Sequence, residues 1–148
     1  MQVKFVSVKE PWASLLTSFV KSAELRSWFP SELLISEWLY IHASKGVDKG
    51  AEDVIRSCVP ARFFDVMVKP RLKLIKPGFV LGKMLFTGAL PSECAENHVV
   101  KALCPPCEDY YLWEFGAACR LVEPFEMKGQ LGIYTRDIDD GLLRTVSD

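Results

Sequence analysis

Residues 3–28 read VKFVSVKEPWASLLTSFVKSAELRSW and contain three structural elements in succession. The first residues of this stretch are mainly β-branched and aromatic, which predicts a short strand over residues 3–8. Pro11 suits the first position of a helix, where its missing N–H costs nothing. Four apolar side chains then follow at the i, i+3, i+4 and i+7 spacing of one helical face: Trp12, Leu15, Leu16 and Phe19. Residues 24–28 alternate with period two, so we expect a second strand after the helix.

The rest of the chain predicts more short strands and a few helices. Residues 38–44 alternate, with one face formed by Leu39, Ile41 and Ala43 and the other by Trp38, Tyr40 and His42. Further strands are expected at residues 78–90, 110–122 and 131–134, and short helices at 50–59 and 92–103. Residues 60–77 are interrupted by three prolines and are expected to form a linker-like segment.

This pattern favours an α+β domain over a doubly wound α/β sheet. About five to six short strands with glycine bends, flanked by two or three helices, are typical of a small mixed β-barrel. The chain has 148 residues, the size of one domain. We expect that domain to span residues 1–136 and to be followed by an acidic, flexible tail at residues 137–148.

Composition excludes several classes of protein. The chain carries 18 Lys and Arg against 19 Asp and Glu, so a protein coated with positive charge for duplex DNA is excluded, although a local basic patch is not. The sequence shows neither a long apolar run nor a secretory signal pattern, so we expect a cytoplasmic protein, or a nuclear one if it is eukaryotic, that binds no membrane. The common nucleotide-binding, metalloprotease and serine-hydrolase motifs are missing, and we expect no cofactor.

Lys21, Glu24 and Arg26 form the most informative polar group in the sequence. Glu24 and Arg26 are two residues apart on a strand and share a face, over which Lys21 can lean from the end of the helix. Arg and Lys would bind phosphate or carbonyl oxygens, and Glu would accept from an exocyclic amine. We expect a cleft whose walls supply stacking surface for a base from nearby rings: Trp12, Trp28, Trp38 or Tyr40. His42 is expected to contact the ligand in the same cleft. The alternatives are a salt-bridge network between helix and strand, and a partly buried His42 bonded to the backbone.

Several segments resemble the ASCH domain family, which has a PUA-like β-barrel fold. They are SVKEPWASLL at 7–16, KSAELRSW at 21–28, IHASK at 41–45, GFVLG at 78–82, YLW at 111–113 and EPFEMKG at 123–129. The resemblance spans about residues 3–135. In two places the chain departs from the family pattern, since Phe19 replaces the signature glycine and Glu10 replaces the usual glutamine before Pro-Trp.

The resemblance implies a protein that binds RNA or is otherwise associated with nucleic acid, as in members linked to transcription coactivators. Some small bacterial relatives hydrolyse the acetyl amide of N4-acetylcytidine, and a nuclease activity is attributed to others. Lys21 matches the catalytic lysine of the amidohydrolases, but their threonine nucleophile falls at Glu24. The strand over residues 79–90 contains no carboxylate to match their glutamate, so the amidohydrolase triad is incomplete.

A run of basic residues interrupts the otherwise balanced charge. No acidic residue occurs between Asp65 and Glu93, whereas five basic residues do: Lys69, Arg71, Lys73, Lys76 and Lys83. Because basic residues alternate with others at 69–73, an extended segment would align them along one edge, where single-stranded RNA or DNA could bind. The alternative is a solvated loop.

Cys94, His98, Cys104 and Cys107 are residue types that bind zinc. The Cys–His spacing is not a common one for zinc, and two adjacent prolines stiffen the turn between Cys104 and Cys107. A zinc site and a redox pair therefore remain alternatives to ordinary semi-buried thiols, which we expect here.

Three hypotheses about function follow. The first is a protein that binds a nucleotide or single-stranded nucleic acid, RNA above all, in the cleft lined by Lys21, Glu24 and Arg26. The second is a hydrolase of a modified nucleoside, or a ribonuclease, with Lys21 as base or nucleophile beside Glu24. The third is a protein-interaction module whose charges are structural. The sequence predicts neither the ligand's identity nor the oligomeric state.

Overall fold

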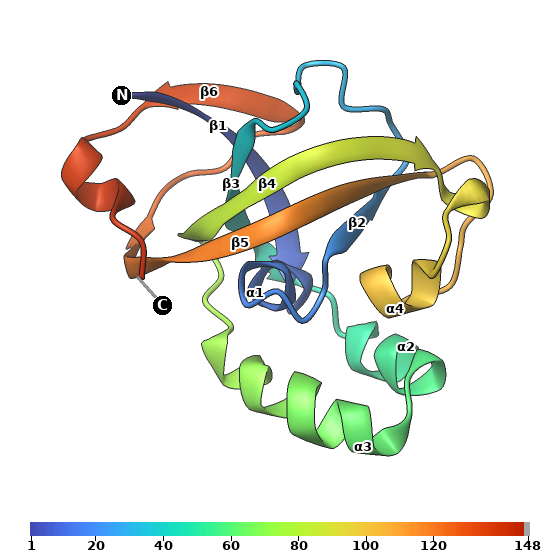
Figure 1. The fold of residues 1–148 in the computed structure, drawn as a ribbon. Coiled ribbons are helices and arrows are strands. Elements are labelled where there is room, and N and C mark those ends of the chain that lie inside the picture. Colours follow the sequence, from blue (N-terminus) through green and yellow to red (C-terminus); the bar gives the residue numbers. More distant parts are fainter. Residues whose placement is uncertain (147–148) are drawn as a thin grey trace.

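A computed structural model describes residues 1–146, which form one curved six-stranded sheet with most of the helical residues on one side (Figure 1). The strands are β1 (Gln2–Glu10), β2 (Ala23–Arg26), β3 (Trp38–Val47), β4 (Phe79–Pro91), β5 (Tyr111–Glu126) and β6 (Ile133–Asp137), in the order β2-β5-β4-β3-β1-β6. The β1–β3 pair is parallel and the other pairs are antiparallel. The predicted α+β, PUA-like architecture is confirmed, although the sheet does not close into a complete barrel, because β2 and β6 remain edge strands.

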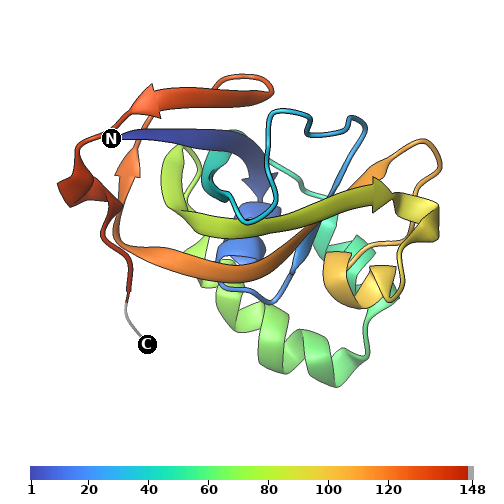
Figure 2. The same cartoon turned by 45° about the horizontal axis from the view of Figure 1, so that its top comes forward.

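The helical elements are short. They comprise α1 (Trp12–Thr17), α2 (Ala51–Cys58), α3 (Ala61–Phe63), η1 (Phe64–Val68), η2 (Lys69–Leu74), η3 (Ser92–Cys94), α4 (His98–Ala102) and η4 (Asp140–Leu143). α1 packs against β1, β3, β4 and β5, and α2 and α3 lie beyond it, away from the sheet (Figure 2). Across residues 1–146, no helix has the length and apolar character required to cross a bilayer.

The prediction of a linker at residues 60–77 is wrong, because residues 61–74 are helical throughout, as α3, η1 and η2. Phe64, Val68 and Leu72 recur at a spacing of four, so they lie on one helical face. Phe64 and Val68 are buried in a cluster with Leu15 and Ile55, and Leu72 packs against it. Pro70 stands in the first turn of η2, where its missing N–H is tolerated. Burial of this apolar face outweighs the helix-breaking tendency of the proline.

The sheet has a hydrophobic core on each face. Leu39, Ile41 and Ala43 belong to the first core with residues of α1, as their alternation predicts. Tyr40 belongs to the second core with Phe5 and Tyr134. Both faces of β3 are therefore covered, and the ring of Tyr40 is not free to line a cleft.

The C-terminal segment covers part of this second core, in place of the flexible tail that we expected from residue 137 onward. Leu143 of η4 is buried in the second core, and Thr145 forms a β-bridge with Leu121. Burial of one leucine and this bridge hold the acidic segment in place as far as residue 146. Residues 147–148 of the predicted tail lie outside the described residues.

The glycine bends predicted in residues 78–90 are confirmed. The β4–β5 register shifts next to Gly82 and Gly88. A Cβ at position 82 would lie 2.5 Å from the carbonyl oxygen of Cys119, so only glycine lets the two strands approach this closely.

Candidate functional site

Lys21, Glu24 and Arg26 come together as the alternation predicts, but two of the three side chains are buried. The Nζ of Lys21 donates to the carbonyl oxygen of Ala102 at 2.7 Å and lies 3.4 Å from Glu24 Oε1. The residue is 1% exposed, and its ammonium lies 4.8 Å from the centre of the Trp12 ring. The positive charge of Lys21 is therefore already balanced by Glu24, and its ammonium group is hydrogen-bonded within the protein.

Arg26 completes this cluster. Its Nη1 lies 3.6 Å from Glu24 Oε2, and its Nη2 donates to the carbonyl oxygen of Ser7 at 3.0 Å. The guanidinium carbon lies 5.8 Å from the ring centres of both Trp28 and Trp113. The arrangement matches the salt-bridge interpretation of this cluster, in which both cations hold one buried carboxylate.

The aromatic side chains predicted around the cluster separate into two groups. Trp12 and Trp28 pack against the first core, near Lys21 and Arg26. Trp38, Tyr40 and His42 do not join them, because alternate residues of β3 point to opposite faces of the sheet. Tyr40 is buried in the second core, while the ring of Trp38 lies 4.5 Å below the ammonium of Lys83. The prediction of a single cleft lined by all of these residues is wrong.

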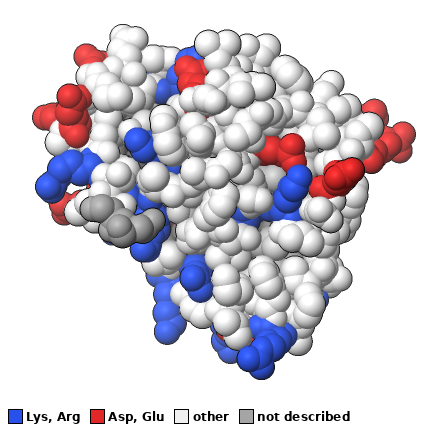
Figure 3. Space-filling view, in the orientation of Figure 1, with Lys and Arg blue, Asp and Glu red and all other residues white. Residues whose placement is uncertain are grey.

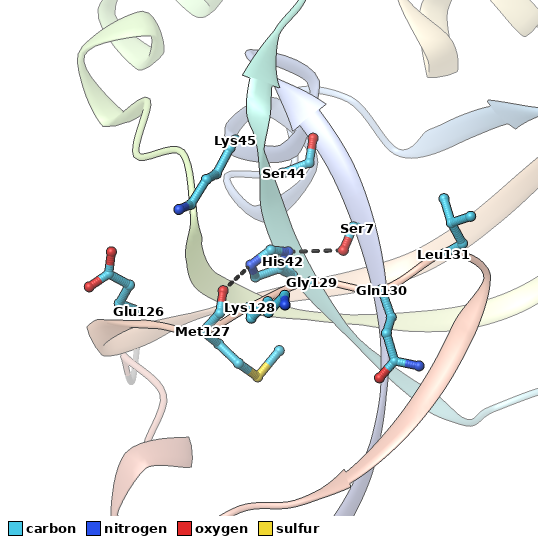
Figure 4. Close-up of a pocket in the computed structure, with 10 residues that line it drawn as sticks. All are labelled: Ser7, His42, Ser44, Lys45, Glu126, Met127, Lys128, Gly129, Gln130 and Leu131. Atoms are coloured by element: carbon cyan, nitrogen blue, oxygen red, sulfur yellow. Dashed lines mark hydrogen bonds between the residues drawn. The ribbon is translucent and has the colours of Figure 1, made fainter.

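His42 instead borders a cavity of about 750 Å³ on the second face (Figure 4). The cavity lies between the end of β3 and the loop that joins β5 to β6. Its lining residues are Ser7, His42, Ser44, Lys45, Glu126, Met127, Lys128, Gly129, Gln130 and Leu131. Sequence reasoning named only His42 among these as a ligand contact, although IHASK at 41–45 and EPFEMKG at 123–129 contain several of them.

The floor of this cavity is a chain of hydrogen bonds whose directions can be deduced. His42 Nε2 lies 2.6 Å from the carbonyl oxygen of Met127, which can only accept, so Nε2 carries the proton. In the neutral ring Nδ1 then accepts from Ser7 Oγ at 2.9 Å. Because the Ser7 hydroxyl proton is used in that bond, Ser7 Oγ accepts from the hydroxyl of Tyr134, also at 2.9 Å. The chain therefore runs from Tyr134 through Ser7 and His42 to the main chain of Met127.

Burial lowers the pKa of His42 below its ordinary value, and the positive charge of Arg136 acts in the same direction. The hydrogen bond to Met127 opposes this shift without cancelling it. His42 is therefore neutral at pH 7, which is the state on which the hydrogen-bond directions above are based.

Gly129 closes tightly over the Ser7–His42 pair. A Cβ at this position would lie 2.7 Å from Ser7 Oγ and 2.9 Å from His42 Nδ1. Any larger residue would push the loop away from the pair, so glycine allows the loop to close over the floor of the cavity.

The basic residues at 69–83 do not form the extended edge that the sequence predicts, because the first three of them are helical. Lys69, Arg71 and Lys73 lie on η2 rather than on an extended segment, so they do not line one edge. Lys76 follows η2 with its ammonium 4.6 Å from the Phe79 ring centre, and Lys83 lies on β4 beside Trp38. Lys and Arg side chains gather over the lower part of the molecule, where the 61–74 helix lies (Figure 3).

The Cys and His residues considered for zinc are placed without a metal-binding arrangement. Within residues 1–146, no group of three or more His, Cys, Asp or Glu side chains could hold a metal ion. His98 is buried, with Nε2 2.8 Å from Ser92 Oγ and Nδ1 3.1 Å from the carbonyl oxygen of Cys104. Burial raises the pKa of the Cys104 thiol, whereas Cys94 is exposed. These contacts favour ordinary thiols around a structural histidine.

The six-stranded mixed sheet with α1 packed beneath it defines an α+β domain of PUA-like type. No family model matches the chain, and no curated protein matches it in sequence. Solved structures of ASCH from Zymomonas mobilis do match, and each covers 88% of this chain. A variant with tyrosine replaced by phenylalanine aligns over 87% of its own chain with a TM-score of 0.57 and 10% identity.

A second variant, with serine replaced by alanine, gives a TM-score of 0.55 at 11% identity over 85% of its chain. The unsubstituted protein gives 0.52 at 10% identity, also over 85%. This chain therefore has the fold of an ASCH domain, as the resemblance in its motifs implies.

Proposed function

We propose that this protein binds a nucleotide or a single-stranded nucleic acid, RNA in the first instance, in the cavity between β3 and the β5–β6 loop. The observation that carries the proposal is a cavity of about 750 Å³ lined by two lysines and several neutral hydrogen-bonding side chains. Small-molecule sites commonly enclose about 300–1,000 Å³, so the space accommodates a nucleotide.

The lining supplies the interactions that a nucleotide needs. Lys45 and Lys128 offer ammonium groups for phosphate oxygens against one carboxylate, that of Glu126. Gln130 carries both a donor and an acceptor, as recognition of a base edge requires. Met127 and Leu131 add apolar surface for the face of a base.

The Lys21–Glu24–Arg26 cluster is a weaker candidate for this role. Lys21 and Glu24 are 1% and 7% exposed, and both cations bind Glu24 or main-chain oxygens. A ligand would have to break these bonds before it could bind there. We assign the cluster a supporting role beneath Trp12 and Trp28.

Fluorescence anisotropy with a labelled single-stranded RNA of eight nucleotides tests the proposal. We expect Lys45→Ala/Lys128→Ala to weaken binding at least tenfold. The matched control, Lys49→Ala/Arg62→Ala, removes the same charge from exposed positions elsewhere and should change affinity less than twofold.

The proposal is overturned if the wild-type protein binds neither this RNA nor mononucleotides. Equal losses in the two double variants would overturn it too, because binding would then follow net charge alone. A loss confined to Lys69→Ala/Arg71→Ala/Lys73→Ala would move the site to the 61–74 helix.

A further inference from the structure

We propose that Ser7 and His42 form a nucleophile–base pair that hydrolyses a carboxylic ester bound in the same cavity. This activity goes beyond ligand binding and involves none of the residues predicted to be catalytic, Lys21 and Glu24. It does not require the ligand to be RNA. The probe class is a small O-acyl ester with a good leaving group.

The geometry of the pair is that of an activated serine. Ser7 Oγ donates to His42 Nδ1 at 2.9 Å, so its proton already points at the acceptor that would remove it. The opposite ring nitrogen donates to the carbonyl oxygen of Met127 at 2.6 Å, which fixes both the tautomer and the orientation of the ring. A nucleophile, a base and a group that orients the base are thus aligned at the wall of a cavity.

Three further features fit an acyl transfer. Burial keeps His42 unprotonated at neutral pH, because it lowers the pKa of the ring. Lys45 and Lys128 line the same cavity and are the cations that would stabilise an oxyanion. Tyr134 donates to Ser7 Oγ, and this hydrogen bond stabilises the negative charge that develops on Oγ when the bond between the acyl carbon and Oγ breaks.

The reaction needs only the ester and water. Ser7 Oγ forms a bond to the acyl carbon while its proton passes to His42 Nδ1. The bond between the acyl carbon and the alcohol oxygen breaks, and that oxygen takes the proton from Nδ1. Water then attacks the acyl-Ser7 ester with loss of a proton to Nδ1, and Ser7 Oγ recovers this proton as it leaves. The net products are a carboxylic acid and an alcohol.

The competing explanation is that the same hydrogen bonds only tie the β5–β6 loop to β1 and β3. Covalent labelling with a fluorophosphonate at pH 7.5, followed by intact mass and peptide mapping, separates the two. We expect one adduct per chain, on Ser7, and none in Ser7→Ala. His42→Gln retains a donor for Met127 but cannot take a proton, so labelling should be at least tenfold slower. Ser57→Ala, at an exposed position of α2, should label as fast as the wild type.

A pH series gives a readout that a structural role would not produce. The labelling rate of the wild type should rise as a single group loses its proton at a pKa below 6.5, and this step should vanish in His42→Gln. The wild-type adduct map decides the matter even if Ser7→Ala fails to fold. An unlabelled Ser7, or labelling spread over several serines, would overturn the inference.

Hydrolysis of p-nitrophenyl butyrate is the second measurement. A burst of one nitrophenol per chain that Ser7→Ala abolishes supports acyl-Ser7, and equal hydrolysis by both proteins refutes it. The RNA titration separates this inference from the proposed function. Labelled Ser7 without binding of RNA or mononucleotides refutes only the proposed function, and RNA or nucleotide binding with an inert Ser7 refutes only the inference.

Discussion

Arg26 donates a hydrogen bond to the main-chain oxygen of Ser7, 3.0 Å away, and so connects β2 to β1 where no strand pairing joins them. The pairing of β1 with β6 ends at Val6, one residue before this oxygen. The guanidinium thus reaches across the open part of the sheet. It also places the cluster of Lys21, Glu24 and Arg26 directly behind Ser7, one of the residues that line the cavity.

Replacing Arg26 with glutamine should lower the free energy of unfolding by about 2 kcal/mol, because Glu24 loses a cation and the Ser7 oxygen loses its donor. Urea denaturation followed by tryptophan fluorescence measures this difference. Arg62→Gln, at an exposed position, is the matched control and should change stability by less than about 0.5 kcal/mol. Equal stability of the two variants would show that the guanidinium does not hold the sheet together.

Lys21 and Glu24 should be strongly coupled in a double-mutant cycle. Lys21→Met and Glu24→Gln each remove one charge of a buried pair whose atoms lie 3.4 Å apart. We expect a coupling free energy of about 1–3 kcal/mol from urea unfolding. RNA affinity of the folded single variants should stay within twofold of the wild type. A tenfold loss of affinity in Lys21→Met without loss of stability would return the ligand to this cluster.

Gly129→Ala tests the close approach of the β5–β6 loop. The added methyl would lie 2.7 Å from Ser7 Oγ, so either the loop or the Ser7–His42 pair must shift. We expect a loss of about 1–3 kcal/mol of stability and a labelling rate of Ser7 at least tenfold lower. Gly46→Ala is the control, since its nearest neighbour, Lys9 Cε, would lie 3.8 Å from the added atom. Unchanged melting temperature and labelling in Gly129→Ala would contradict the tight closure.

Stability should depend on the two histidines at mildly acidic pH. Burial lowers the pKa of both His42 and His98 from 6.5, so the folded state binds their protons less readily than the unfolded state. The free energy of unfolding should therefore fall as the pH drops below 6.5, by at most about 1.4 kcal/mol per pH unit for each histidine. The fall ends below the folded pKa values. Urea titrations between pH 7.5 and 5 should show that the free energy of unfolding depends less steeply on pH in His42→Gln and in His98→Gln. An unchanged pH dependence in both variants would refute the lowered pKa of the two histidines.

Salt should weaken RNA binding in proportion to the phosphates that the cavity neutralises. For single strands, each phosphate contact contributes about 0.7 to the slope of log affinity against log salt concentration. Lys45→Ala and Lys128→Ala should each reduce that slope by about this amount. Anisotropy titrations between 50 and 300 mM KCl measure it. A slope that neither substitution alters would place the phosphates elsewhere.

Local patterns predict much of this fold. The apolar spacing of Trp12, Leu15 and Leu16 marks a real helix, but this helix ends at Thr17, and Phe19, the fourth residue of the predicted apolar face, is 42% exposed with a φ of 60°. The period-two spacing of Glu24 and Arg26 places them on one face beside Lys21. Both depend on neighbours a few residues apart, where periodicity is informative. The helix at 61–74 escaped prediction because Pro70 within it and Pro60 and Pro77 beside it are conspicuous, whereas its apolar face matters only once α1 and α2 supply a surface to bury it.

The cavity could not be predicted from local patterns. His42 bonds Ser7 across 35 residues of sequence and Met127 across 85. The first contact follows from the parallel β1–β3 pairing, and the second from a loop held close by Gly129. Ser7 and Gly129 stand in two of the segments that resemble the ASCH family, but neither segment indicates that the two residues meet, because their proximity depends on strand pairing over long distances. The sequence could indicate which residue types form this site, but not that Ser7, His42 and Gly129 would lie in contact.

Glu10 has a mechanical consequence for the cavity. This carboxylate is 0% exposed, with Oε1 accepting from the main-chain N–H of Ser14 in α1 and Oε2 from that of Lys76. Two residues after Lys76, the carbonyl oxygen of Gly78 accepts from Met127, whose own oxygen holds His42. Residues 76–78, which follow the 61–74 helix, therefore connect two parts of the molecule. Lys76 is held by Glu10 beneath α1, and Gly78 is bonded to Met127, whose carbonyl oxygen orients His42. A continuous series of hydrogen bonds thus links the buried carboxylate of Glu10 to the Ser7–His42 pair through the main chain of Lys76, Gly78 and Met127.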